Sequence, residues 1–286
     1  MDDAEGARSQ DDAEGARTQE AAFAQNRTSW DQRVPVHVAS EFYDVEGWLR
    51  EGRGPRPGDA DALGDVSGLD LVHLQCHFGL DTLAWARVGA RVTGLDFSEP
   101  AIEQARELAR RAGLEDRATF VWANVYDAVE ALGHETFDVV YVSLGALCWL
   151  PSVDRWAAVA AALTRPGGRL FLRDVHPLSD ALSDDELVVE HTYYEEPEPY
   201  VDDSGFTYTD GTHSLSIARN YSWNHSLGQI VTAVIGHGFA LEALEEHDWT
   251  SFARFPWLVR TGDHHYSLPP GRPRVPLSFS LLARRL

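Results

Sequence analysis

The sequence predicts an α/β fold, in which a mostly parallel sheet carries helices on both faces. An apolar run in DLVHLQCHFG (70–79) stops at a glycine turn and is followed at once by a helical pattern over 80–90. The next apolar run, RVTGLDFS (91–98), ends in the acid Asp96. Short strands that alternate with helical segments are typical of such a sheet.

The same periodicities place the later elements. Ser98 is a good N-cap and Gly113 a helix stop, so we expect a helix between them. We expect two further helices, near 152–164 and 226–237. Five further strands are expected at 118–125, 137–146, 169–175, 239–248 and 277–284. The last two strands are joined by a long excursion, which suggests an antiparallel hairpin that closes one edge of the sheet.

The segments outside this core have distinct compositions. A nine-residue unit of small and acidic residues occurs twice, at 2–10 and 11–19, and predicts a disordered acidic tail over 1–20. Residues 21–66 predict an N-terminal helical arm or lid before the core at 67–176. An aromatic and acidic stretch at 177–221 predicts an inserted cap, and 222–286 returns to the core pattern.

Composition excludes several classes of function. The net charge of −21 disfavours nucleic acid as a partner, and the absence of lysine rules out a Schiff base and a Walker-type phosphate loop. No apolar run reaches the roughly 18 residues of a membrane span, and no signal-peptide pattern is present. We therefore expect a cytoplasmic protein with no membrane partner. Cys76 and Cys148 lack metal-ligand spacing, so we expect no metal; a homo-oligomer remains open.

The stretch from 70 to 96 has the layout of a nucleoside-binding half-unit. Backbone N–H groups of the turn and the helix N-terminus can receive the polar part of a cofactor. Asp96 can accept hydrogen bonds from both ribose hydroxyls. A dinucleotide enzyme would need G-x-G-x-x-G for its pyrophosphate, whereas this turn carries the bulky Gln75 and His77.

With these features the chain resembles the class I S-adenosylmethionine-dependent methyltransferases, strongly over 67–176 and by layout over 222–286. Of the family's glycine loop only Gly79 survives, and HLQCHFGLDTL resembles a small-molecule branch with a Leu-Gln-Cys-His loop. The resemblance implies a Rossmann-like class I methyltransferase sheet and S-adenosylmethionine as cofactor. The cofactor-binding residues that it implies are Gln75, His77, Gly79, Asp96, Phe97, Asn124, Val125, Ser143 and Leu144. Asn124 stands where the family usually has an Asp that accepts from the adenine amino group.

Asp174 and His176 are the candidate catalytic residues. They are two positions apart, so on an extended segment they would share one face, as a general base and its orienting partner. The alternative is that Asp174 caps the following turn while His176 packs against Pro177. Aromatic side chains of the arm and cap are candidates for substrate binding or ordinary packing: Trp30, Tyr43, Tyr193, Tyr221 and Trp223.

Together these features predict a methyltransferase that acts on a small-molecule acceptor in secondary metabolism, at oxygen or nitrogen. One alternative is a C-methyltransferase for an isoprenoid or aromatic acceptor, in which Asp174 removes the proton. The other is a non-catalytic module that binds the cofactor. The acidic run at 184–203 disfavours anionic acceptors.

Overall fold

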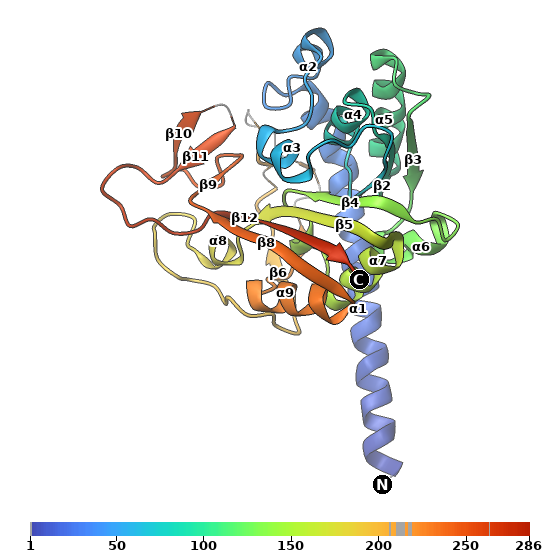
Figure 1. The fold of residues 1–286 in the computed structure, drawn as a ribbon. Helices are drawn as coiled ribbons and strands as arrows, with labels where there is room; N and C mark the ends of the chain where they lie inside the picture. The colour runs from blue at the N-terminus through green and yellow to red at the C-terminus, as the bar shows by residue number, and fades with distance from the viewer. Residues whose placement is uncertain (1, 206, 210–214, 217–218, 263) are drawn as a thin grey trace.

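A seven-stranded sheet forms the centre of the molecule, with strand order β3-β2-β1-β4-β5-β12-β8 (Figure 1). The computed structural model describes residues 2–205, 207–209, 215–216, 219–262 and 264–286, of which 2–18 are described by their backbone alone. The seven strands are β1 (Asp70–Leu74), β2 (Arg91–Asp96), β3 (Ala118–Trp122), β4 (Phe137–Ser143), β5 (Thr164–Val175), β8 (Phe239–His247) and β12 (Ser278–Arg285). Strands β1 to β5 pair in parallel. The expected α/β class is confirmed.

Strands β8 and β12 form the antiparallel pair that the sequence predicts at one edge of the sheet, with β8 outermost, and β12 also runs antiparallel to β5. Ser278, the first residue of β12, lies opposite Val175 of β5 and His247 of β8. The carboxyl ends of β5 and β8 therefore reach the same edge of the sheet as the start of β12. This is also the edge at which β1, β2 and β4 end.

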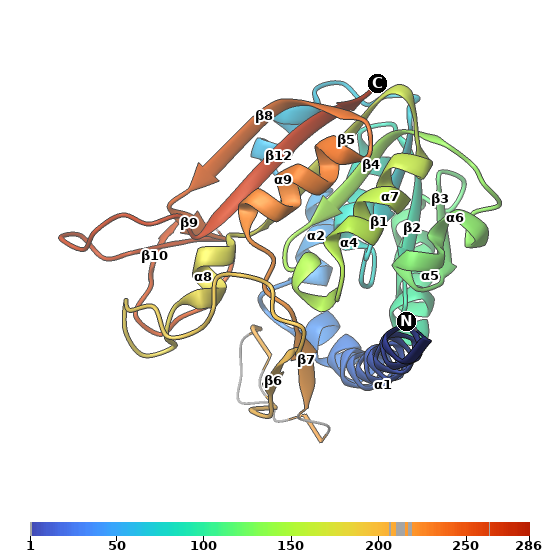
Figure 2. The same cartoon turned by 90° about the horizontal axis from the view of Figure 1, so that it is seen from below.

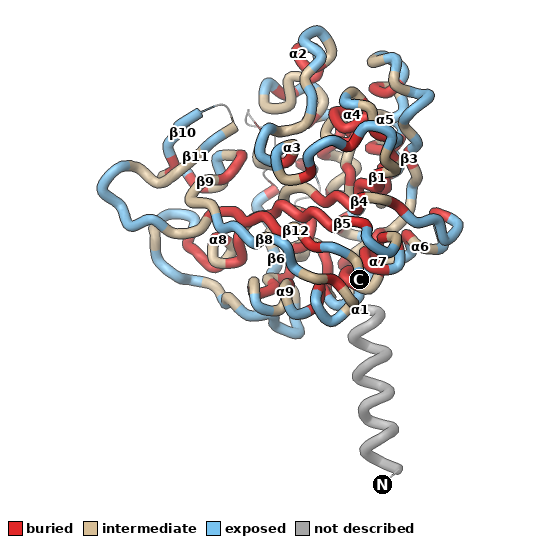
Figure 3. Tube along the Cα trace, in the orientation of Figure 1, coloured by how far each residue is buried: buried red, intermediate tan, exposed pale blue. Residues whose placement is uncertain are grey.

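Helices cover both faces, as Figures 1 and 2 show. The helices of one face are α3 (Pro57–Leu63), α4 (Leu80–Arg87) and α5 (Glu99–Ala112), and those of the other are α6 (Ala128–Ala131), α7 (Val153–Leu163) and α9 (Leu227–Gly236). In β4, Val139 and Tyr141 face the first group, whereas Val140 and Val142 face the second. Both faces are buried, which explains the unbroken apolar run in the sequence (Figure 3).

A buried carboxylate fastens α3 to the sheet. Asp59 is fully buried and accepts hydrogen bonds from the Tyr141 hydroxyl at 2.6 Å and from Arg173 Nε at 2.5 Å. The two donors come from the neighbouring strands β4 and β5, so one side chain fixes the arm to both. Burial raises the pKa of Asp59, and the Arg173 charge opposes this shift.

The N-terminal segment differs from its expectation. Helix α1 runs from Asp2 to Ala39, so the backbone of the described part of the expected tail is helical and projects from the body (Figure 1). Each copy of the repeat holds two Ala, one Glu, one Arg and one Gln, which favour helix, beside two Asp, one Gly and one Ser or Thr, which do not; neither copy contains a proline. Nearer the core, Asn26 exchanges two 2.8 Å hydrogen bonds with the backbone of Tyr221. This places α1 against the cap; α2 (Val45–Glu51) and α3 complete the arm.

Two insertions extend from the carboxyl edge of the sheet. The first insertion follows β5. It contains α8 (Pro177–Ala181) and the antiparallel pair β6 (Tyr200–Asp202) and β7 (Asn220–Ser222). Residues 206, 210–214 and 217–218 of the expected cap lie outside the described residues. The second connects β8 to β12 and forms a small sheet of β9 (Trp249–Thr250), β10 (Val259–Gly262) and β11 (His265–Ser267). Within the described residues, no helix combines the length and apolar character that crossing a membrane requires.

Candidate active site

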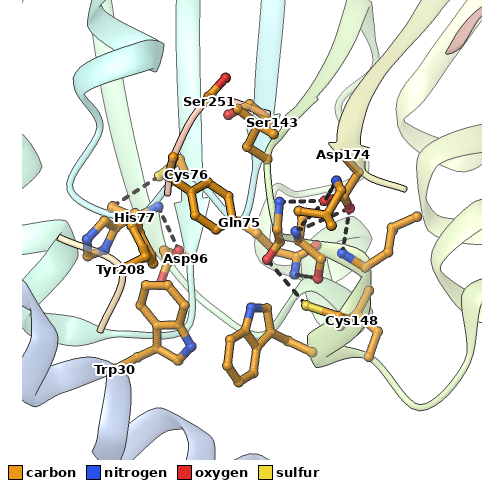
Figure 4. Close-up of a pocket in the computed structure, with 18 of the residues that line it drawn as sticks. Trp30, Gln75, Cys76, His77, Asp96, Ser143, Cys148, Asp174, Tyr208 and Ser251 are labelled. Atoms are coloured by element: carbon orange, nitrogen blue, oxygen red, sulfur yellow. Dashed lines mark hydrogen bonds between the residues drawn. The ribbon is translucent and has the colours of Figure 1, made fainter. Parts of the chain in front are cut away.

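A cavity of about 470 Å³ opens at the carboxyl ends of β1, β2, β4 and β5, between α1 and the two insertions. In Figure 4, Asp96 and Asp174 lie on opposite sides of it, with Gln75 between them. Most of the predicted site residues line this cavity: Trp30, Tyr43, Gln75, His77, Gly79, Asp96, Phe97, Asn124, Val125, Ser143, Leu144, Asp174 and Trp223. His176, Tyr193 and Tyr221 are not among the lining residues.

The loop after β1 adopts a left-handed backbone at three positions. The φ angles of Gln75, His77 and Gly79 are 57°, 51° and 79°. A Cβ atom at Gly79 would lie 2.7 Å from the Phe120 ring and 2.9 Å from the Ala105 Cβ. The surviving glycine is therefore required by packing as well as by conformation, whereas Gln75 and His77 carry side chains into the cavity at some conformational cost.

Asp96 is the carboxylate at the end of β2. Its Oδ2 accepts a 2.8 Å hydrogen bond from the His77 N–H, and its Oδ1 accepts one of 2.9 Å from the Ser98 N–H. Each oxygen retains one lone pair for a further donor. Burial raises the pKa of Asp96 to about 6, against the effect of these hydrogen bonds, so the group is mainly ionised at neutral pH. An ionised, fixed carboxylate with two free acceptor positions suits a vicinal diol.

The neighbouring strand end supplies Asn124. Its side-chain oxygen caps η1 (Val125–Asp127) by accepting a 3.0 Å hydrogen bond from the Tyr126 N–H, which ends the expected strand at Trp122. One lone pair of the Asn124 oxygen remains for an amino donor. Phe97 and Val125 line the cavity between Asp96 and this cap.

His77 is fixed by a histidine of the N-terminal arm. Its Nε2 lies 2.9 Å from Nδ1 of His37, whose Nε2 lies 2.6 Å from the Thr207 hydroxyl. Burial lowers the pKa of His37 to about 3 and that of His77 well below its usual value. Both rings are therefore neutral at neutral pH. Trp30 packs edge-on against the His77 ring, with ring centroids 5.2 Å apart.

His73 and Ser143 connect β1 to β4 beneath the loop. His73 Nε2 lies 3.1 Å from the Ser143 hydroxyl, and its Nδ1 lies 2.8 Å from the Thr82 hydroxyl. Burial lowers the pKa of His73 to about 4. The rings of His73 and His77 thus have separate partners and do not converge with Cys76 on one point.

Asp174 has a structural role that its position in the sequence did not reveal. Its two oxygens accept hydrogen bonds from the N–H groups of Gly145 at 2.5 Å, Leu147 at 2.9 Å and Val175 at 2.8 Å, and also from Ala146. These donors occupy the four acceptor positions of a carboxylate. Asp174 therefore anchors the loop between β4 and η2 (Leu147–Trp149). Burial raises its pKa to about 6, against these hydrogen bonds.

His176 does not form the expected catalytic pair with Asp174. It is the N-cap of α8, where its Nδ1 accepts a 3.0 Å hydrogen bond from the Leu178 N–H, and its Nε2 lies 2.9 Å from Glu246 Oε1. The backbone of His176 is still extended, but its ring nitrogens are taken by Leu178 and Glu246 and the Asp174 oxygens by backbone N–H groups, so the two side chains do not contact each other through a hydrogen bond. The alternative assigns the capping role to Asp174 and packing against Pro177 to His176, whereas in the structure it is His176 that caps the turn.

Two predicted aromatic residues stabilise the cap instead of lining the cavity. The Tyr193 hydroxyl accepts a 3.2 Å hydrogen bond from the Leu227 N–H at the start of α9. Tyr221 lies in β7, where its backbone pairs with Asn26. Their assignment to substrate binding is not supported by this geometry, whereas Trp30, Tyr43 and Trp223 remain candidates.

Several cavity residues were not predicted. They are charged or aromatic side chains of the arm, of η2 and of the two insertions: Arg33, Arg56, Trp149, Asp180, Asp202, Phe252 and Arg254. The segment SFARFPW (251–257), with a single base among aromatic residues, is the one signal in the sequence for the second insertion. Asp180 had no comparable signal, since it lies at the start of a long acidic stretch.

Residues 72–172 match the family model of a methyltransferase domain. A ubiquinone biosynthesis O-methyltransferase from Methylobacterium sp. is 32% identical over 152 residues, which are 52% of this chain and 59% of that protein. A 27-O-demethylrifamycin SV methyltransferase from Amycolatopsis mediterranei is 37% identical over 150 residues, or 50% and 53% of the two chains. The chain thus spans between half and three-fifths of the length of these relatives.

Solved structures share the fold over a larger part of the chain. An S-adenosylmethionine-dependent methyltransferase from Mesorhizobium loti is 21% identical, with a TM-score of 0.56, over 84% of this chain and 100% of that one. A second structure, described as such an enzyme from Listeria monocytogenes, is 18% identical, with a TM-score of 0.57, over 79% and 95% of the two chains. At these identities the likeness concerns the fold.

Proposed function

Residues 72–172 are a methyltransferase domain within the class I S-adenosylmethionine-dependent fold, and on that premise we propose that the protein methylates an oxygen atom of a small-molecule acceptor. The observation that carries this proposal is the buried carboxylate of Asp96. It lies at the end of β2, is held by two backbone N–H groups and keeps a free lone pair on each oxygen. The two hydroxyl groups of a nucleoside ribose could donate the remaining hydrogen bonds to Asp96.

Other lining residues fit the same cofactor. Gln75 Oε1 is buried and has no hydrogen-bond partner among the described residues, while its Nε2 donates to the Ala146 carbonyl at 2.8 Å. The ammonium group of a methionine moiety is a donor that would satisfy this oxygen. Trp30 and Trp149 meet edge to face beside the cavity, and their rings favour a cationic centre such as a sulfonium.

In the proposed reaction, S-adenosylmethionine supplies an activated methyl group when it is bound. The protein then has to hold both reactants in line, exclude water and remove a proton from the acceptor. Asp96 and Asn124 would hold the nucleoside, and Gln75 and Ser143 the amino acid part. The Asp174 carboxylate fixes the Gly145–Leu147 loop that borders the acceptor side.

The chemistry of the cavity supports a hydroxylated acceptor without negative charge. Five aspartates and three arginines line it, so the lining carries a net negative charge. The lining residues with ionisable charge are Asp81, Asp96, Asp174, Asp180, Asp202, Arg33, Arg56 and Arg254. Relatives from the rifamycin and erythromycin pathways are named as methyltransferases, the latter as a 3''-O-methyltransferase, which favours secondary metabolism and oxygen over nitrogen.

Carbon methylation is less well supported, because the Asp174 lone pairs that would take up the proton already accept backbone N–H groups. We retain the cytoplasm as part of the proposal, since Cys76 and Cys148 are both free thiols.

Calorimetry with S-adenosylhomocysteine and transfer of a labelled methyl group to a panel of neutral phenols and alcohols test the proposal. Binding together with labelling of at least one alcohol or phenol is the expected result. Absence of binding would contradict the cofactor assignment. Binding without any labelled product would favour the non-catalytic module.

A further inference from the structure

We propose that Asp180 is the general base of the acceptor side and that Arg254 positions it. This inference rests on the proposed function, since it concerns how the acceptor hydroxyl loses its proton. Asp180 lies in α8 of the first insertion, and Arg254 lies between β9 and β10 of the second. Both side chains line the cavity.

The two residues form an ion pair between the insertions. Arg254 Nη2 lies 2.7 Å from Asp180 Oδ1, and the two side chains are 27% and 24% exposed. The Arg254 guanidinium also lies over the Phe255 ring, 5.1 Å from its centroid. The pair is therefore partly desolvated, and its arginine is held from two sides.

Asp180 differs from Asp96 and Asp174 in its partners. Like Asp81, it has an arginine partner; the Asp81 Oδ2 lies 3.6 Å from Arg56 and accepts from the Ser143 hydroxyl at 3.4 Å. Asp96 and Asp174 accept backbone N–H groups on both oxygens. Asp202 accepts the Ser204 N–H at 2.8 Å. Among the described residues, no donor forms a hydrogen bond with Asp180 Oδ2. Asp180 thus offers an oxygen that can approach an acceptor hydroxyl.

The groups around Asp180 give it mixed electrostatic surroundings. Burial raises the pKa of Asp180, and the charge of Arg254 opposes this shift most strongly; the imidazoles of His176 and His225 act in the same direction as Arg254. Cys148 and Asp174 lie on the cavity side of Asp180. Burial and the nearby carboxylates of Asp180 and Asp174 raise the pKa of the Cys148 thiol, and burial raises the pKa of Asp174. The net effect is a raised pKa for Asp180, which makes this carboxylate a better proton acceptor than an ordinary aspartate.

The step balances without a further reactant. The acceptor O–H proton moves to Asp180 Oδ2 as the acceptor oxygen forms a bond to the methyl carbon. The carbon–sulfur bond breaks, and its electron pair remains on sulfur. The products are a methyl ether, a neutral thioether and a protonated Asp180, which then returns its proton to solvent. The charge of Arg254 favours the ionised form of the resting Asp180.

One test measures the base directly and needs no acceptor. Aspartate labelled with ¹³C at the side-chain carboxyl is titrated by NMR in the S-adenosylhomocysteine complex, and Asp180→Asn assigns the resonance. The expected result is an Asp180 midpoint above that of ordinary aspartate, which rises further in Arg254→Gln. A midpoint at or below the ordinary value, or one that Arg254→Gln leaves in place, would overturn the inference.

The second test measures turnover with the acceptor found in the labelled-methyl panel. Asp180→Asn should lower kcat at least a hundredfold while the Kd for S-adenosylhomocysteine changes less than twofold. Arg254→Gln should move the acid limb of the kcat/KM profile to higher pH. The matched control is Asp248→Asn, which removes an exposed pair with Arg274 in the same insertion, outside the cavity, and should change neither quantity.

Failure of this inference is distinguishable from failure of the proposed function. If the wild-type protein methylates an acceptor and Asp180→Asn retains more than half of its kcat, the function stands and Asp180 is not the base. If Asp180→Asn and Arg254→Gln lower the melting temperature equally and leave the pH profile in place, the pair only joins the insertions. If the wild-type protein does not bind S-adenosylhomocysteine, the proposed function itself fails.

Discussion

The Nδ1 atom of His37 lies 2.9 Å from the Nε2 atom of His77, which joins the N-terminal arm to the loop after β1. One nitrogen donates and the other accepts, so the contact requires at least one neutral ring. Burial lowers the pKa of both residues, to about 3 for His37. The contact therefore makes the arm sensitive to acid.

This pair predicts a loss of stability on acidification. Because the folded pKa lies below the unfolded value of about 6.5, the unfolded state binds more protons below that pH, and the stabilisation present above it is lost as the pH falls. At pH 5 the loss amounts to about 2 kcal/mol for each buried histidine. Melting temperatures between pH 7.5 and 5 check this.

The variant His37→Gln should reduce the slope of melting temperature against pH. Part of the slope should persist, because His73 is buried and its pKa is also lowered. An unchanged slope would mean that His37 is protonated in the folded protein or that α1 does not cover the loop.

Asp96 should determine cofactor affinity. Asp96→Ala removes two acceptors for a ribose, and hydrogen bonds to a charged group contribute about 1.5–3 kcal/mol each, so affinity for S-adenosylhomocysteine should fall at least tenfold. Asp96→Asn keeps one acceptor oxygen, so its affinity for S-adenosylhomocysteine should lie between those of the wild type and Asp96→Ala. Calorimetry measures the series. The control Asp65→Ala, on an exposed loop, should bind like the wild type.

Asp174 should contribute to stability more than to proton transfer. In Asp174→Asn an amide NH₂ replaces either Oδ1, which accepts from Gly145 and Val175, or Oδ2, which accepts from Leu147. A buried donor without its partner costs about 1–3 kcal/mol. Denaturant unfolding measures this loss. A variant of wild-type stability with abolished turnover would return Asp174 to the role of base.

The pH dependence of Asp174 has the opposite sign to that of the histidines. Burial raises its folded pKa to about 6, so the folded state holds the proton more tightly than the unfolded state. The contribution of Asp174 to stability should therefore fall as the pH rises from about 4 to 6. Comparing Asp174→Asn with the wild type across this range isolates the effect.

Gly79 should tolerate no side chain. Gly79→Ala places a Cβ against Phe120 and Ala105 at a φ of 79° and should cost more than the strain of a left-handed residue alone. Gly113→Ala is a matched control, because its φ is 66° and nothing lies within 4 Å of the added Cβ. The difference between the two free energies of unfolding measures the packing cost. If the two variants lose the same free energy of unfolding, the loop around Gly79 shifts to accommodate the added Cβ atom.

Much of the fold could be predicted because its central strands are buried on both faces. Such strands appear in the sequence as unbroken apolar runs, and glycines and caps mark their ends, as Ser98 and Gly113 do for α5. The structures of the N-terminal tail and of the second insertion were harder to predict from the sequence. A helix that projects from the body has no apolar stripe, and strands of two to four residues, such as β9 and β10, are too short to show a period.

The site was predictable on one side only. The residues around Asp96 follow strand ends directly, so the order of elements in the sequence brings them together. Asp180 and Arg254 lie in different insertions, and nothing local in the sequence indicates their contact. Asp174 was misleading for a related reason: whether a carboxylate at a strand end faces a ligand or binds backbone N–H groups depends on the loop of the neighbouring strand.

The antiparallel course of β12 has a consequence for how this molecule could diversify. The second insertion leaves the sheet at His247 and returns at Ser278, two residues that face each other across one pair of strands. A segment with adjacent ends can be exchanged for another of different length without altering any crossover or strand register. The second insertion, one of the two that border the cavity, can therefore be exchanged as a single cassette while the strands around Asp96 stay constant.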